Sequence, residues 1–283
     1  MRAKPLTFAF IFIVAVAACF FLFSRWPAHS SASAFAASSP KQPVIVELFT
    51  SEGCSSCPPA DSLLKKLSED QPFDGIEILA LEEHVDYWNT LGWSDPFSSV
   101  DFSRRQEQYA VSLPDGGIYT PQMIVDGAAQ FVGNRTHESR DQIRWAASHP
   151  KPRLLLTAVP NSNPHTRTFQ ITLPPQPSPG IPSAVSAPRN PSSSAPALEL
   201  WIALTEKNLS STVTAGENSG ETLHHAPVVR VLRKQQSVAL PFTTPVTVTV
   251  DLNDKWIPAN LTAIAFLANP TTRQIQAAGS SPL

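Results

Sequence analysis

The sequence predicts an α/β N-terminal domain, residues 41–150, followed by a β-rich, sandwich-like C-terminal domain, residues 151–283. In the first part, short apolar runs alternate with amphipathic helical patterns, which is typical of a sheet covered by helices. In the second part, short strand-like runs follow one another with turn signals between them and no long helical pattern. That texture is typical of an antiparallel β domain.

The elements of the N-terminal part follow from the spacing of its apolar residues. Two β-branched apolar runs, 44–49 and 76–81, predict buried strands. Asp-Gly at 126–127 predicts the turn of a hairpin whose strands are 123–125 and 129–132. Leucines at helical spacing predict a helix early in the domain, and similar patterns predict two more: 60–67, 96–111 and 136–148.

The C-terminal part is expected to consist of strands and one insertion. The strands are predicted at 154–159, 169–173, 198–205, 228–232, 238–241, 246–252 and 262–267. Eight prolines lie among serines and alanines between Pro174 and Pro196. Such a tract lacks backbone donors and large apolar side chains, so we expect a disordered insertion at about 174–197.

The N-terminus predicts export. Arg2 and Lys4 precede an uncharged stretch of 18 residues, 6–23, and Ala34-Phe35-Ala36 fits a signal peptidase site. We expect residues 1–36 to be a cleaved signal peptide. The stretch is also long enough for an uncleaved membrane anchor, and Cys19 leaves lipidation open. Each alternative puts the folded part outside the cytoplasm, in the periplasm or the extracellular space.

Cys54 and Cys57 are the only cysteines left once the leader is removed. A bond between them would close too small a loop to constrain the unfolded chain, so redox chemistry explains the pair better than stability does. At a helix start the first thiol is favoured as a thiolate, which attacks, and the second then resolves the mixed disulfide. A structural zinc site needs four ligands, and no second paired motif supplies the other two.

Thr120-Pro121 precedes the strand at 123–125. Thioredoxin-like proteins carry a cis-proline before the corresponding strand, facing the CxxC motif, and the alternative is an ordinary trans-proline. Together with the order strand–CxxC–helix, this predicts a thioredoxin-like fold for the N-terminal domain. Pro121 and Thr120 would then align a substrate strand, and Glu47 would be the buried acid that assists proton transfer, unless it is an exposed carboxylate at the strand end.

Further polar residues lie at the end of the second predicted strand. His84 and Asp86 are expected to border the cysteines, where His84 would tune the thiolate, bind a metal or serve a structural role. Trp88 would form part of a wall for a partner peptide, with core packing as the alternative. His224 and His225 are adjacent, so on a strand they point to opposite faces and cannot form a compact metal pair.

Four stretches resemble an exported bacterial family catalogued as domain of unknown function 1223. They are 47–61 (ELFTSEGCSSCPPAD), 84–93 (HVDYWNTLGW), 119–127 (YTPQMIVDG) and 217–230, which contains ENSG, His225 and VVR. The resemblance covers residues 43–275 and implies a thioredoxin-like fold and redox chemistry, without a substrate. Two features depart from thioredoxin itself: Gly53 precedes the first cysteine, and Pro58-Pro59 follows the second.

The function predicted from the sequence is an exported thiol–disulfide oxidoreductase acting on protein thiols and disulfides in the cell envelope. We expect no cofactor and no metal, and membrane contact only through an uncleaved N-terminal segment. A net charge of −2 gives no reason to expect nucleic acid as a partner. Two alternatives remain: a copper carrier using both cysteines with Met123 or His84, and a non-catalytic interaction module.

Overall fold

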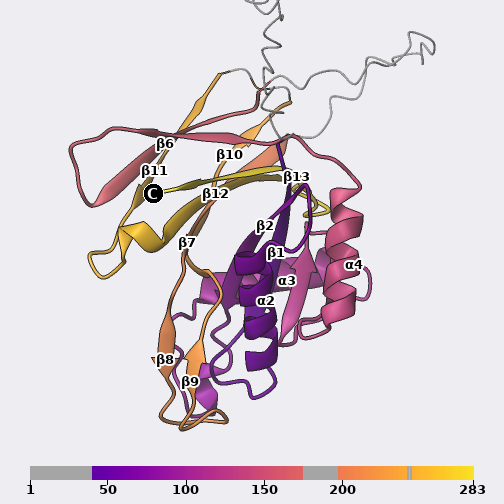
Figure 1. The fold of residues 1–283 in the computed structure, drawn as a ribbon, viewed down its shortest axis with the longest axis vertical. Helices are drawn as coiled ribbons and strands as arrows, with labels where there is room; N and C mark the ends of the chain where they lie inside the picture. The colour runs from indigo at the N-terminus through magenta and orange to yellow at the C-terminus, as the bar shows by residue number, and fades with distance from the viewer. Residues whose placement is uncertain (1–39, 175–196, 241, 243) are drawn as a thin grey trace, which may run out of the picture. The chain divides into compact units, whose positions relative to one another are not determined.

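A mixed eight-stranded sheet organises the chain (Figure 1). The computed structural model describes residues 40–174, 197–240, 242 and 244–283. The sheet has the order β13-β12-β7-β10-β2-β1-β3-β4. In chain order its strands are β1 (Gln42–Thr50), β2 (Ile76–His84), β3 (Gln122–Val125), β4 (Ala129–Val132), β7 (Leu198–Glu206), β10 (Val228–Val238), β12 (Leu261–Ala268) and β13 (Ile275–Pro282).

Three α-helices cover the two faces of the N-terminal half of this sheet. They are α2 (Pro58–Asp70), α3 (Val100–Ser112) and α4 (Thr136–Ala147). On one face, Leu64 of α2 and Ile143 of α4 pack with Val46 of β1. On the other face, Phe102 of α3 packs with Ile45, also of β1. Successive residues of a strand point to opposite faces, so β1 and β2 contribute side chains to both cores.

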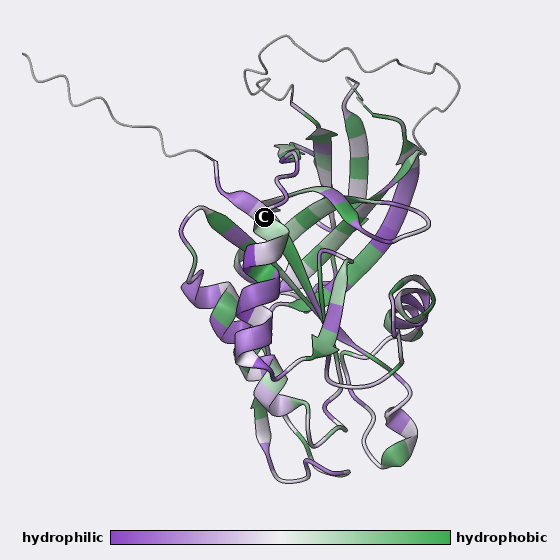
Figure 2. Ribbon diagram, turned by 90° about the vertical axis from the view of Figure 1, so that its right-hand side faces the viewer, coloured by the Kyte–Doolittle hydropathy of each residue, from purple (hydrophilic) through white to green (hydrophobic). Residues whose placement is uncertain are grey.

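The C-terminal strands complete the fold. A three-stranded sheet of β5 (Leu155–Val159), β6 (Thr166–Thr172) and β11 (Val246–Asp251) shares an apolar core with β7 and β12. β8 (Ser210–Thr212) and β9 (Thr222–His224) form a separate hairpin. In Figure 2 the strands carry long hydrophobic stretches, whereas the helices mix hydrophilic and hydrophobic residues. No helix of the described residues is long and apolar enough to span a bilayer.

Most of the predicted elements are confirmed, and several bounds differ. α3 begins at Val100, where the Ser99 side chain accepts a hydrogen bond from the Asp101 N–H and caps the helix. The turn of the β3–β4 hairpin is confirmed, with φ of 49° at Asp126 and 62° at Gly127. Of the run predicted at 238–241, the described residues 238–240 form no strand of their own, because Val238 ends β10. β8, β9 and β13 were not predicted.

The predicted fold class, a thioredoxin-like α/β domain followed by a separate β-rich domain, is wrong. The structure consists mostly of strands, and the sheet continues from β2 into β10, β7, β12 and β13. Val228 of β10 pairs in parallel with Glu82 of β2, so β2 is an internal strand. Apolar periodicity shows that a strand is buried but not which strand lies beside it, and this is why the prediction failed. Residues 40–283 form one compact unit.

Two predicted segments lie outside the described residues. They are the signal peptide, 1–36, and the core of the proline-rich insertion predicted at about 174–197.

Candidate functional site

The site is centred on a disulfide between Cys54 and Cys57, in the turns that join β1 to α2. The Cys54 N–H donates to the Ser51 carbonyl at 3.1 Å, and the Cys57 N–H donates to the Cys54 carbonyl at 3.1 Å. α2 begins at Pro58, so Cys57 is its N-cap and Cys54 precedes it by three residues. Cys54 and Cys57 are 1% and 0% exposed, whereas the two serines between them are exposed.

Asp61 is a buried acid one helical turn after Cys57. Its N–H donates to the Cys57 carbonyl at 3.1 Å, and its carboxylate accepts a hydrogen bond from the Thr50 hydroxyl at 2.6 Å. Burial, together with the negative charge of Glu82, raises the pKa of Asp61 to about 8. A carboxyl with that pKa exchanges a proton near neutral pH, within one turn of a cysteine.

The loop between β8 and β9, residues 213–221, covers the cysteine motif; we call it the covering loop. The Asn218 side-chain amide donates to the carbonyls of Glu52 at 2.8 Å and Cys54 at 3.1 Å. The Glu217 carboxylate accepts a hydrogen bond from the Ser55 N–H at 2.9 Å. Gly216 has a φ of 75°, and a Cβ there would come within 3.1 Å of Trp93 Cβ. Glycine is therefore required for the close approach of this loop.

Trp88 links the cysteine motif to the Thr120-Pro121 segment. Its indole N–H donates to the Thr120 hydroxyl at 2.8 Å, and a Cβ on Gly53 would lie 3.4 Å from Trp88 Cβ. The Thr120–Pro121 bond is cis, which confirms that prediction. Pro121 is buried near the start of α2. The Cβ atoms of Ala60, in α2, and of Pro121 both lie beside Gly133, because a Cβ built on that glycine would be 3.1 Å from the first and 3.3 Å from the second.

Beside the motif lies a buried cluster of charged side chains, which we call the histidine cluster. Its members are Glu52, Glu82, His84, Asp95 and His225, each at most 4% exposed. Burial lowers the pKa of each histidine, but the neighbouring carboxylates outweigh it. They raise the pKa of His84 well above its usual value and that of His225 to about 9. Asp95 also connects the cluster to the motif, because it accepts a hydrogen bond from the Glu52 N–H at 2.8 Å.

Glu47 lies on the opposite face of the sheet, in a second buried cluster. Its carboxylate pairs with Arg105 at 2.5 Å and accepts a hydrogen bond from the Tyr109 hydroxyl at 2.5 Å. Glu83, next to Glu82 on β2, approaches the same guanidinium at 3.5 Å. Burial and the charge of Glu47 raise the pKa of Glu83 well above its usual value. We call this group the arginine cluster.

The structure brings some of the sequence-predicted residues together at the motif and separates others from it. Thr120 contacts Trp88, and His84 belongs to the histidine cluster. Asp86 instead accepts a hydrogen bond from Ser103 at 2.5 Å. Met123 lies in the core beneath α2 and α4.

Sequence reasoning missed Asp61, Glu52, Asn218 and the place of His225 beside the motif. The sequence did carry a signal for these residues, because all four lie within stretches that carry the family resemblance. Those stretches converge on one site, although up to 166 residues separate the groups that contact each other.

Solved structures resemble most of this chain in fold. One is the X-ray crystal structure of a protein from Agrobacterium tumefaciens, with a TM-score of 0.59 and 22% identity over 86% of this chain and 95% of that one. Another is HBP35 of Porphyromonas gingivalis, with a TM-score of 0.58 and 15% identity over 87% of this chain and 76% of that one. At these identities the likeness concerns the fold alone. The search of curated proteins gave no match. The family model for a protein of unknown function, DUF1223, matches residues 45–268, so the chain belongs to the DUF1223 family.

Proposed function

We propose that the protein is an exported thiol–disulfide oxidoreductase that exchanges disulfides with proteins of the cell envelope. One observation carries the proposal: the Cys54–Cys57 disulfide lies within one helical turn of Asp61, a buried acid whose pKa is about 8. A bond spanning three residues contributes little to stability, so its place at the junction of four segments is better explained by chemistry.

Cys54 is the attacking residue in this proposal. It adjoins the exposed Ser55, and the contacts of the covering loop with the motif are hydrogen bonds that can open. In the reduced protein the Cys54 thiolate attacks a substrate disulfide, forms a mixed disulfide and releases one substrate thiolate. The Cys57 thiol then gives its proton to the Asp61 carboxylate and attacks the Cys54 sulfur. This step restores the Cys54–Cys57 bond and releases the second substrate thiolate, so the protein is oxidised as the substrate is reduced.

Asp61 takes the proton-transfer role that the sequence suggested for Glu47. The carboxylate of Glu47 is engaged by Arg105 and Tyr109 on the other face of the sheet. The Asp61 side chain instead accepts a hydrogen bond from the Thr50 hydroxyl, and it lies in the first turn of the helix that Cys57 caps. In the reverse direction Asp61 returns the proton to Cys57, so the same machinery serves oxidation and reduction.

The experiment is an exchange assay between the reduced full chain and an oxidised model peptide. The matched control is a free peptide of sequence SEGCSSCPPA, which has the motif without the fold. We expect the protein to exchange faster than the peptide, Cys54→Ala to lose the reaction, and Cys57→Ala to stop at the mixed disulfide. A folded protein that exchanges no faster than the free peptide contradicts the proposal.

A further inference from the structure

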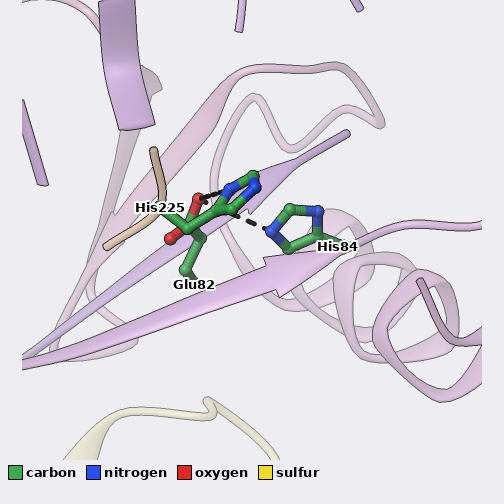
Figure 3. A group of neighbouring side chains, drawn as sticks. All are labelled: Glu82, His84 and His225. Carbon is green, nitrogen blue, oxygen red and sulfur yellow. Dashed lines mark hydrogen bonds and ion pairs between the residues drawn. The ribbon is translucent and has the colours of Figure 1, made fainter. Parts of the chain in front are cut away.

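Three side chains of the histidine cluster point at one another in the protein interior (Figure 3). Glu82 and His84 are two residues apart on β2, so they lie on the same face, and His225 comes from the turn between β9 and β10. Their exposed fractions are 0%, 0% and 1%. One ligand atom from each lies within 4.8 Å of the others.

The distances between these atoms suit a bound metal ion. His84 Nε2 lies 3.5 Å from Glu82 Oε1, and His225 Nδ1 lies 3.4 Å from the same oxygen. Metal–ligand bonds of 2.0–2.2 Å in a tetrahedral site separate the ligand atoms by about 3.3–3.6 Å. Two of the three pairs of ligand atoms are therefore at the spacing of a tetrahedral site, and the two histidine nitrogens lie within 4.8 Å of each other.

Each imidazole has a carboxylate behind it. His84 Nδ1 lies 2.7 Å from Asp95 Oδ2, and His225 Nε2 lies 3.1 Å from Glu52 Oε1. A carboxylate on the outer nitrogen holds a proton there, and a metal ion would displace the proton of the inner nitrogen, which faces Glu82. This arrangement is common around metal-binding histidines, because it fixes the ring and makes the ligand more basic.

Three atoms inside the cluster have no hydrogen-bond partner among the described residues. They are Glu52 Oε1, Glu82 Oε2 and His84 Nε2, all fully buried. Buried polar atoms are nearly always satisfied, because leaving one unpaired costs free energy. Two of the three, Glu82 Oε2 and His84 Nε2, belong to the proposed ligands, and a cation bound by Glu82 and His84 would satisfy them.

The cluster approaches the protein surface at His225. This residue lines a surface pocket of about 340 Å³ together with Lys65, Ser68 and Asn208. Its side chain is 1% exposed, so entry of an ion from the pocket requires movement of that side chain.

We propose that Glu82, His84 and His225 bind one divalent transition-metal ion, and that the ion is Zn²⁺. Two imidazoles and one carboxylate form a ligand set that zinc takes, with the fourth position left to water. The cysteines are not part of this site. The ion would tie β2 to the turn that follows the β8–β9 hairpin, and so hold the covering loop against Cys54.

The test is zinc binding by the chain carrying Cys19→Ser, with the Cys54–Cys57 disulfide closed and no reductant present, so that thiolates cannot bind the ion. After dialysis against a chelator, Zn²⁺ is titrated by calorimetry, and Co²⁺ is used as a spectroscopic probe. We expect one ion per chain, a rise in melting temperature, and Co²⁺ d–d bands of a four-coordinate site without sulfur-to-metal charge transfer. Zinc binding should persist in a double variant with alanine at both cysteines.

Variants then assign the ligands. His84→Ala and His225→Ala should each weaken zinc binding at least 100-fold. The matched control is His224→Ala, which removes the exposed neighbour of His225 and should leave binding unchanged. If the ligand variants do not fold, the wild-type stoichiometry and the Co²⁺ spectrum decide. Wild-type protein that binds no Zn²⁺, binding that survives both ligand variants, or a sulfur-containing Co²⁺ spectrum overturns the proposal.

Discussion

Glu82 and Glu83 are neighbours on β2, yet they enter two different kinds of buried site. Glu83 points to the arginine cluster, where Arg105 faces Glu47 and burial raises the pKa of Glu83 well above its usual value. The positive charge of Arg105 balances the negative charge of the Glu47 carboxylate, and the protonated Glu83 adds no charge. Glu82 points to the histidine cluster, where three carboxylates surround two histidines and where we propose a metal ion. One face of the strand is built for stability, and the other retains capacity for chemistry.

The comparison predicts its largest effect at Arg105. The substitution Arg105→Met leaves the Glu47 carboxylate buried without a cation beside it. We expect this change to lower the free energy of unfolding by about 3–5 kcal/mol. Urea denaturation measures this loss. Arg104→Met is the matched control, because Arg104 is exposed, and should change stability by less than about 0.5 kcal/mol. Lost disulfide exchange with stability retained would show that the arginine cluster belongs to the reactive site.

The next effect concerns proton transfer at Asp61. Asp61→Asn should slow resolution of the mixed disulfide by about 100-fold at pH 7, the scale of general acid–base catalysis. Quenched-flow analysis of the intermediate measures this rate. The control is Asp70→Asn at the exposed end of the same helix, which should leave the rate unchanged. Equal rates in wild type and Asp61→Asn would remove Asp61 from the mechanism.

The same residue predicts a dependence of stability on pH. The pKa of Asp61 is about 8 in the folded protein and 3.8 as the unperturbed reference, so the folded state holds more protons between those values. Its contribution to stability is therefore fully present below pH 4 and is lost as the pH rises through 8. In chelator-treated protein, Asp61→Asn should gain stability relative to wild type over this range. A constant difference in the unfolding free energy would contradict the raised pKa.

A smaller effect is expected at the covering loop. Asn218→Ala removes two hydrogen bonds to the motif, each worth about 0.5–1.5 kcal/mol, and should speed reduction of the disulfide by dithiothreitol about tenfold. Thiol alkylation followed over time measures the rate. Glu221→Gln, at an exposed position of the same loop, is the control. An unchanged rate in Asn218→Ala would show that the loop does not limit access to Cys54.

The sequence predicted local structure better than strand neighbours. The positions of β1 and α2 follow from apolar spacing, although both elements extend beyond the predicted bounds, and the β3–β4 turn follows from Asp126-Gly127. Pairing of β10 with β2 depends on contacts between residues more than 140 apart, which local periodicity does not encode. The same limit explains why Cys54 and Cys57 were identified while Asn218 was not, because its partners are more than 160 residues away.

The central claim is that Cys54 and Cys57 exchange disulfides in a fixed order, and trapping of the mixed disulfide tests it most directly. Each single-serine variant is reduced, mixed with an oxidised peptide and analysed by intact mass under non-reducing conditions. We expect Cys57→Ser to accumulate one peptide per chain, because the resolving thiol is absent, and Cys54→Ser to accumulate little. Equal trapping by the two variants, or trapping by neither in folded protein, would contradict the account.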